Sequence, residues 1–176
     1  MIISVFGLGY VGCVTSACLA RDGHTVIGVD VNPLKLEQLR AGRSTVIEPG
    51  LDDLVSNAVK QDQLDVTSDS NGAVQRSDIS LVCVGTPSEM NGSLNLMYVD
   101  SVCAQIGAAV GQKDDYHVVV IRSTVLPTTV RKRIIPSLEK HSGKTAGVDF
   151  GVCTNPEFLR EGSAIADYYE PSFILI

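Results

Sequence analysis

Hydrophobic residues are concentrated in short runs along this chain, separated by longer amphipathic stretches. An apolar run of four to six residues bounded by turn residues is typical of a strand buried on both faces of a parallel sheet. On this basis we predict strands at residues 2–6, 25–30, 64–67, 79–84, 117–122 and about 148–153, and a last apolar run covers 172–176.

The stretches between these runs have helical spacing and recognisable ends. Asn32 followed by Pro33 predicts a helix cap and first turn, and Gly23 ends the first helix. Helices are expected at 10–21, 33–40, 51–60, 71–75 and 98–110, after Pro127, and as a turn or helix at 156–166. This alternation predicts one α/β domain, a doubly wound and mainly parallel sheet with helices on both faces.

The first strand leads straight into a glycine motif, Gly7-x-Gly9-x-x-Gly12, and the second strand ends on Asp30, eighteen residues after Gly12. Strand, glycine turn, helix, strand and acid in this order form the dinucleotide-binding fingerprint of a Rossmann-type domain. Gly7 allows the tight turn, Gly9 lets the pyrophosphate approach the backbone, and Gly12 lets the helix pack closely against the sheet. The helix that begins near Tyr10 directs its positive end at the phosphates.

The acid at the end of the second strand indicates which dinucleotide is bound. Asp30 is expected to accept hydrogen bonds from the adenosine ribose, and its charge would repel a 2′-phosphate. No arginine follows it immediately, so NAD is favoured over NADP. Lys35 is close enough in sequence to touch the ribose or a phosphate, although a solvated helix lysine is an equal alternative.

Composition narrows the class of partner. The 176 residues carry a net charge of −6, which argues against nucleic acid or an anionic membrane. No run reaches the ~20 apolar residues of a membrane helix, and Met1 leads directly into a core strand rather than a signal peptide. Five cysteines without a CxxC pair suggest buried thiols in a reducing cytoplasm. No cluster has metal-ligand spacing, and the three histidines are interpreted as structural.

Three further strand ends carry candidate chemistry. Thr86, in Val84-Gly-Thr-Pro87, could line the cofactor or belong to an ordinary terminating loop. Thr124 offers a hydroxyl at the next strand end, or it caps the following helix. Asn155-Pro156 is expected to cap a helix that places Glu157 and Glu161 at i and i+4, where two carboxylates could orient water or take a proton from an alcohol. Alternatively, Glu157 complements the helix dipole and Glu161 is solvated.

Taken in order, these motifs resemble the UDP-glucose/GDP-mannose dehydrogenase family over the whole chain. Details are closer to its GDP-mannose 6-dehydrogenase branch, whereas the UDP-glucose branch more often shows Ser-Thr-Val-Pro-Val-Gly after the fifth strand. The motifs are Phe6-Gly-Leu-Gly-Tyr-Val-Gly12, Glu48-Pro-Gly-Leu51, Val84-Gly-Thr-Pro87, Arg122-Ser-Thr-Val-Leu-Pro127, Gly147-Val-Asp-Phe-Gly151 and Thr154-Asn-Pro-Glu-Phe-Leu-Arg-Glu161.

The resemblance implies a four-electron oxidation of the C6 alcohol of a nucleotide sugar, GDP-mannose in this branch, to a carboxylate with two NAD. By position, Glu157 and Thr124 look like the pair that places water and handles protons, and Glu161 like the residue at the junction of NAD and sugar. Phe158, Leu159 and Arg160 would border the sugar. The implied NAD contacts are Gly7, Gly9, Tyr10, Val11, Gly12, Asp30, Lys35, Thr86, Thr124 and Glu161.

One departure limits what this chain can do. The family's nucleophile is a cysteine in a Gly-x-Cys-x-Pro-Lys motif, which does not occur in these 176 residues, and the surroundings of Cys153 do not match it. The resemblance therefore implies an NAD-binding domain over 1–176, inactive alone, without the linker helix, dimerisation and sugar-binding parts of a homo-oligomeric parent. The apolar ending at Ile176 agrees with a longer parent. Thr128 stands where relatives often have glycine.

Two alternatives remain open from the sequence. One keeps the reaction and changes the substrate to UDP-glucose or a UDP-N-acetylhexosamine. The other is a stand-alone, non-catalytic NAD-binding module with a regulatory role, which would not need Thr124, Glu157 and Glu161.

Overall fold

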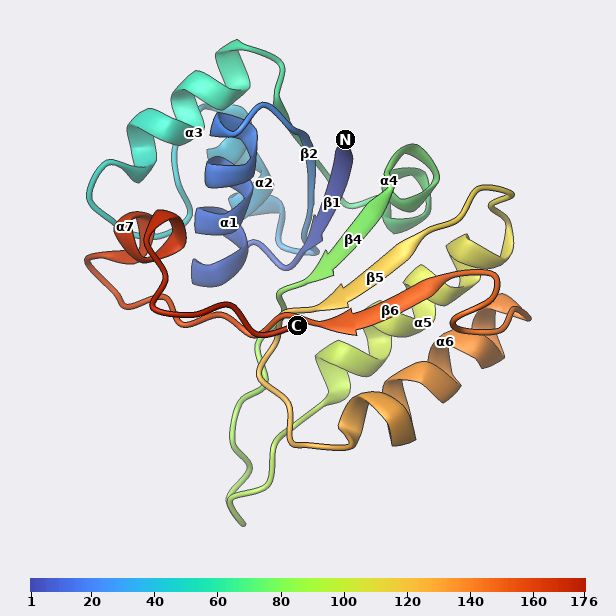
Figure 1. The fold of residues 1–176 in the computed structure, drawn as a ribbon. Coiled ribbons are helices and arrows are strands. Elements are labelled where there is room, and N and C mark those ends of the chain that lie inside the picture. Colours follow the sequence, from blue (N-terminus) through green and yellow to red (C-terminus); the bar gives the residue numbers. More distant parts are fainter.

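A computed structural model describes all residues, 1–176, and shows one six-stranded sheet in which every neighbouring pair is parallel. The strand order is β3-β2-β1-β4-β5-β6. The chain thus adds β2 and β3 on one side of the central β1, and then β4, β5 and β6 on its other side (Figure 1). This order confirms the predicted Rossmann-type, doubly wound sheet. The strands are β1 (Ile2–Phe6), β2 (Thr25–Val29), β3 (Leu64–Thr67), β4 (Ile79–Val82), β5 (Val118–Ile121) and β6 (Gly151–Thr154).

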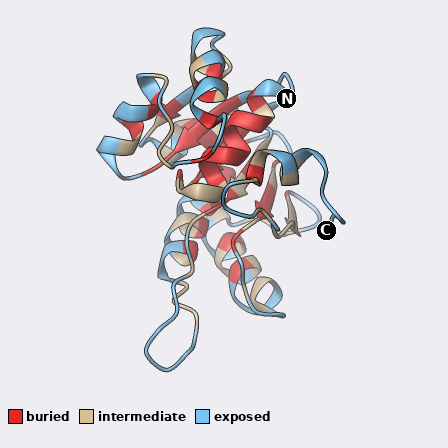
Figure 2. Cartoon of the chain, turned by 90° about the vertical axis from the view of Figure 1, so that its left-hand side faces the viewer, coloured by how far each residue is buried: buried red, intermediate tan, exposed pale blue.

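Helices cover both faces of the sheet, and each face has its own apolar core. The first face is covered by α1 (Tyr10–Arg21), α2 (Pro33–Arg40), α3 (Leu51–Lys60) and α7 (Ala164–Tyr169). The second is covered by α4 (Ser70–Arg76), α5 (Met97–Gly111), the π-helical turn η1 (Val130–Ile134) and α6 (Ile135–Ser142). Figure 2 shows the buried residues gathered in the strands and in the helix faces against them.

Strand alternation explains how two cores arise from one sheet. Ile3 and Val5 of β1 point into the first core, whereas Phe6 points into the second, since successive side chains of a strand face opposite ways. Helix starts also follow the sequence. The Asn32 side chain accepts a hydrogen bond of 3.0 Å from the Leu34 N–H, as expected for a cap followed by Pro33.

A closed ring of buried, hydrogen-bonded polar groups joins β1, β4 and the residue before β5. Ser77, Ser4 and Ser80 form a chain of hydroxyl hydrogen bonds of 3.0 and 2.7 Å that ends 2.8 Å from His117 Nε2. His117 Nδ1 lies 3.1 Å from the Ser77 carbonyl, which also accepts a bond from Lys113. The other two histidines, His24 and His141, contact no other titratable side chain through a hydrogen bond. All three therefore agree with a structural interpretation.

Three segments, two after β6 and one after β4, have structures that the local sequence patterns specified only in part. Of the turn or helix expected at 156–166, residues 161–163 form a turn and α7 begins at Ala164, whereas residues 155–160 have no regular structure. Residues 172–176 form no strand and are exposed. Between β4 and α5 the expected loop is a protruding hairpin, in which Glu89 N–H donates to the Ser93 carbonyl and Asn95 N–H to that of Pro87. Figure 2 shows this arm projecting from the domain, mostly exposed at its tip.

The cysteines are all free, and four of the five are buried, while Cys153 is partly exposed. No group of acidic, histidine or cysteine side chains could hold a metal ion. None of the helices combines the length and apolarity that a bilayer crossing requires.

Thr128 has a φ of 73°, in the left-handed region that β-branched residues rarely adopt.

Candidate functional site

The carboxyl ends of five strands lie level with one another at one edge of the sheet. Phe6 of β1 is level with Val29 of β2 and Val82 of β4, Val82 is level with Ile121 of β5, and Ile121 with Thr154 of β6. The glycine turn, Asp30, Thr86, Thr124 and the segment from Asn155 all follow these strand ends. Ligands of open parallel sheets bind at this edge, beside the point where the strand order reverses, here between β1 and β4.

The glycine turn leaves the end of β1 and is packed tightly at two of its three glycines. Gly7 has a φ of 91°, and a Cβ on Gly12 would lie 1.8 Å from the Gly7 carbonyl oxygen. A Cβ on Gly9 would meet nothing within 4 Å. Protein packing therefore explains Gly7 and Gly12 but leaves the space over Gly9 open, beside the first turn of α1, which has no capping side chain.

Asp30 lies on the other side of this turn and is almost fully buried. Its Oδ2 accepts hydrogen bonds from the Leu8 N–H at 2.7 Å and from Lys35 Nζ at 3.1 Å, and its Oδ1 accepts one from the Asn32 N–H at 2.9 Å. Burial works against ionisation, but these bonds outweigh it and lower the pKa of the Asp30 carboxyl. Lys35 is thus neither free in solvent nor directed elsewhere, but paired with Asp30.

The two threonines predicted at the site are brought together. The Thr86 hydroxyl donates a hydrogen bond of 2.9 Å to the Thr124 carbonyl, which joins the loops after β4 and β5. The Thr124 side chain is exposed and caps no helix, because the next helical turn begins only at Val130. Its hydroxyl is therefore available to a ligand at this edge.

The Asn155-Pro156 signal for a helix was wrong because tertiary contacts engage the asparagine side chain. Arg122 Nη1 donates to Asn155 Oδ1 at 2.5 Å, and Asn155 Nδ2 donates to the Leu175 carbonyl at 3.0 Å. Glu157 Oε2 accepts from the Leu159 N–H at 2.6 Å, while Glu161 is exposed on a turn. The two carboxylates consequently do not share a helix face, and the chain runs irregularly between them.

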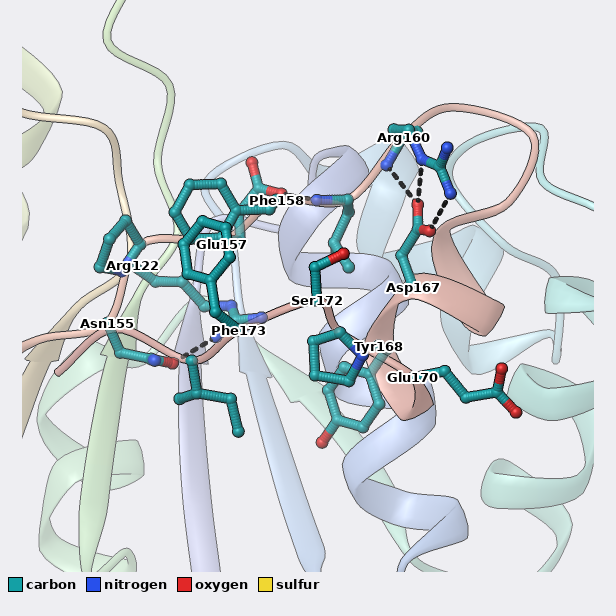
Figure 3. A pocket seen from close by; sticks show the side chains of 14 residues that line it. Arg122, Asn155, Glu157, Phe158, Arg160, Asp167, Tyr168, Glu170, Ser172 and Phe173 are labelled. Atoms are coloured by element: carbon teal, nitrogen blue, oxygen red, sulfur yellow. Dashed lines mark hydrogen bonds and ion pairs between the residues drawn. The ribbon is translucent and has the colours of Figure 1, made fainter.

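This irregular segment and the chain's last residues enclose a hollow of about 580 Å³. Figure 3 shows Arg122 and Asn155 at one end of it and Arg160 paired with Asp167 at the other. The rings of Phe158 and Phe173 lie between them with centroids 4.6 Å apart. Arg160 is thus held by an ion pair with Asp167, and Phe158 and Arg160 both reach the surface around the hollow.

Glu48 belongs to one of the sequence motifs, but the sequence predicts no role for it. In the structure its buried carboxylate accepts a hydrogen bond of 2.6 Å from the Tyr10 hydroxyl. Burial and the Glu48 carboxylate raise the pKa of Tyr10 to about 12, so the phenol stays protonated and donates. No local pattern signals this pair, since 38 residues separate its members.

Comparison with known proteins identifies the family. The family model described as "UDP-glucose/GDP-mannose dehydrogenase family, NAD binding domain" matches residues 1–176. The chain belongs to this family. It is 51% identical to a GDP-mannose 6-dehydrogenase of Azotobacter vinelandii over its full length and 37% identical to a UDP-glucose 6-dehydrogenase of Haloferax volcanii. It spans 40% of the length of either relative.

A solved structure supports the same assignment. A ternary complex of GDP-mannose dehydrogenase from Pseudomonas aeruginosa superposes with a TM-score of 0.98 at 52% identity, over 99% of this chain and 40% of that one. Members of this family are NAD-dependent, and the turn fits the cofactor. Open space over Gly9 leaves room for a pyrophosphate, and the acceptor site of the Asp30 carboxylate that its three bonds leave over suits a ribose hydroxyl.

Proposed function

We propose that this chain is the NAD-binding part of a dehydrogenase that oxidises the C6 alcohol of GDP-mannose to the carboxylate with two NAD. The observation that carries the proposal is the identity of 51% to GDP-mannose 6-dehydrogenases against 37% to a UDP-glucose 6-dehydrogenase, in both cases over the whole chain. Since the chain spans 40% of these relatives, the substrate, the reaction and a homo-oligomeric parent in the reducing cytoplasm are all parts of the proposal.

The residues of the turn would bind and orient the cofactor. Gly9 and the start of α1 would hold the pyrophosphate, with Tyr10 and Val11 in the first helical turn. Asp30 would hold the ribose, and Lys35 would keep its carboxylate in place. When bound, NAD supplies the acceptor for hydride from the alcohol.

The polar groups further along the edge would serve the substrate. Thr86 and Thr124 lie on joined loops where the nicotinamide end of the cofactor is expected. Glu157 would orient water with Thr124, since one of its oxygens has no partner within the protein. Glu161 is free to reach the sugar, and Phe158, Leu159 and Arg160 would border it.

No cysteine in the chain lies in a Gly-x-Cys-x-Pro-Lys context. We therefore propose that residues 1–176 bind NAD but oxidise no sugar without further chain.

Two measurements test the proposal. The first is calorimetric titration of the chain with NAD and NADP, where tighter binding of NAD is expected. The second is NADH formation by the full-length protein with GDP-mannose and with UDP-glucose. Faster turnover of UDP-glucose would assign the protein to the other branch, and NAD binding without any turnover would favour a regulatory module.

A further inference from the structure

Two carboxylates, Asp30 and Glu48, are buried in this chain. Asp30 pairs with Lys35, whereas Glu48 pairs with no cation and instead accepts three hydrogen bonds. Its Oε2 accepts from the Tyr10 hydroxyl at 2.6 Å and from the Gly162 N–H at 2.8 Å, and its Oε1 accepts from the Ala164 N–H at 2.9 Å. Three donors thus replace the water that burial removes, which keeps the group charged.

These donors come from two parts of the proposed site. Tyr10 directly follows the open glycine of the turn and begins α1. Gly162 and Ala164 close the irregular segment that carries Glu157 and Glu161, at the point where α7 begins. The Tyr10 hydroxyl also lies 3.2 Å from the Arg160 carbonyl. A single side chain therefore joins the cofactor turn to the substrate side.

Apolar packing of Leu159 and Ala164 against the first core, and bonds from the Tyr169 hydroxyl to α1 and Asp22, also hold this part of the chain, but none of them reaches the glycine turn. Residues 155–160 belong to no helix or strand, and of them the Asn155 N–H donates to a strand carbonyl, that of Ile121. The Arg160–Asp167 pair closes the segment on itself, with Arg160 N–H and side chain both donating to Asp167. That pair sets the shape of the loop but does not attach it to the cofactor turn. The hydrogen bonds that tie residues 160–164 to the first residue of α1 are made by Glu48 and by the Tyr10 hydroxyl.

We propose that Glu48 is a positioning residue, which holds the segment bearing Glu157 and Glu161 at a fixed place relative to the NAD-binding turn. This inference rests on the proposed function. A carboxylate suits the task because each oxygen accepts and neither donates. A glutamine would present an NH₂ group to one of the N–H or O–H donors, so at least one contact would be lost.

The test compares three variants of the full-length protein. Glu48→Gln removes the charge and one acceptor, and Tyr10→Phe removes only the hydroxyl donor. Asp53→Asn is the matched control, because Asp53 is an exposed carboxylate on α3 that makes no side-chain hydrogen bond or ion pair. Each variant is measured for amide hydrogen exchange in residues 158–164 and for kcat and KM with NAD and sugar.

For Glu48→Gln we expect exchange in 158–164 to rise about tenfold or more and kcat to fall about 10- to 100-fold. The KM for NAD should change less than about threefold, because the turn itself keeps its contacts. Tyr10→Phe should shift both readouts in the same direction by a smaller factor, and Asp53→Asn should match the wild type.

Exchange in 158–164 equal to that of Asp53→Asn would overturn the proposal. So would a KM for NAD that rises in parallel with the loss of kcat, since that result indicates general damage rather than lost positioning. If the wild type oxidises no nucleotide sugar, the proposed function fails, while a rise in exchange in Glu48→Gln alone would still show the attachment.

Discussion

Lys35 Nζ lies 3.1 Å from Asp30 Oδ2, at the end of the second strand where the adenosine ribose is expected. The ammonium offsets part of the charge that would repel a 2′-phosphate, and it is only partly exposed. Cofactor preference in this chain therefore depends on both members of the pair rather than on the acid alone.

Removing the charge of Asp30 should weaken the preference for NAD. Asp30→Asn keeps an acceptor for the buried Leu8 N–H, whereas Asp30→Ala leaves that N–H unpaired at a cost of about 1–3 kcal/mol in unfolding free energy. We expect the NAD to NADP affinity ratio to fall about tenfold in Asp30→Asn, as measured by calorimetry. Lys35→Ala should change the ratio in the opposite direction. Equal affinity of the wild type for both cofactors would refute the argument.

The glycine turn offers a matched pair of substitutions. Gly9→Ala adds a methyl group to open space, at a residue with φ −79°, and should keep wild-type stability. Its NAD dissociation constant should nevertheless rise about tenfold or more, because the methyl occupies the approach of the pyrophosphate. Gly12→Ala would force its Cβ to 1.8 Å from the Gly7 carbonyl oxygen and should lose about 3 kcal/mol or more of stability. Thermal unfolding and NAD titration separate the two effects, and unchanged NAD affinity in Gly9→Ala would contradict this placement.

The buried His117 should make the fold sensitive to acid. Burial, and next the nearby Lys113 ammonium, depress the pKa of His117 from its ordinary 6.5 to about 4. A histidine whose pKa is lower in the folded state than in the unfolded one stabilises the fold fully above about pH 6.5. This contribution, about 3 kcal/mol, is lost as the pH falls toward 4. Urea unfolding of the wild type and of His117→Gln across this range should show a flatter dependence in the variant. Parallel curves would count against a neutral His117.

The backbone of Thr128 is strained, because its φ of 73° is a conformation that glycine adopts more easily. A left-handed conformation costs about 1–2 kcal/mol for such a residue, partly offset by the greater entropy of glycine in the unfolded chain. Thr128→Gly should therefore stabilise the protein by about 0.5–1 kcal/mol, which corresponds to a rise of roughly 1–4 °C in Tm. Thr129→Gly is the control, since Thr129 has a helical φ of −56°, and it should destabilise. A lower Tm in Thr128→Gly would disprove the strain.

Local patterns were enough to predict the scaffold. Apolar runs placed all six strands, and α1 and α2 begin and end where the glycine turn, Asn32 and Arg40 indicated. These features depend on residues close together in the sequence. The tight contact of Gly12 with Gly7 was likewise predictable, because the fingerprint requires it.

The polar segment after β6 could not be predicted in the same way. Asn155-Pro156 carries a local helix signal, but Arg122 and the Leu175 carbonyl take up the asparagine side chain from elsewhere in the chain. The partners of Glu48 were hidden for the same reason, since a motif gives no information about donors more than a hundred residues away.

Glu48 is separated from Gly162 by 114 residues and from Ala164 by 116. Bringing such distant groups together costs loop entropy that only prior assembly of the intervening strands can reduce. We therefore expect the contact to form after β3 to β6 have joined the sheet. In that order a chain that is still folding has its glycine turn before it has an organised substrate side, and completion of the site would be among the last events of folding.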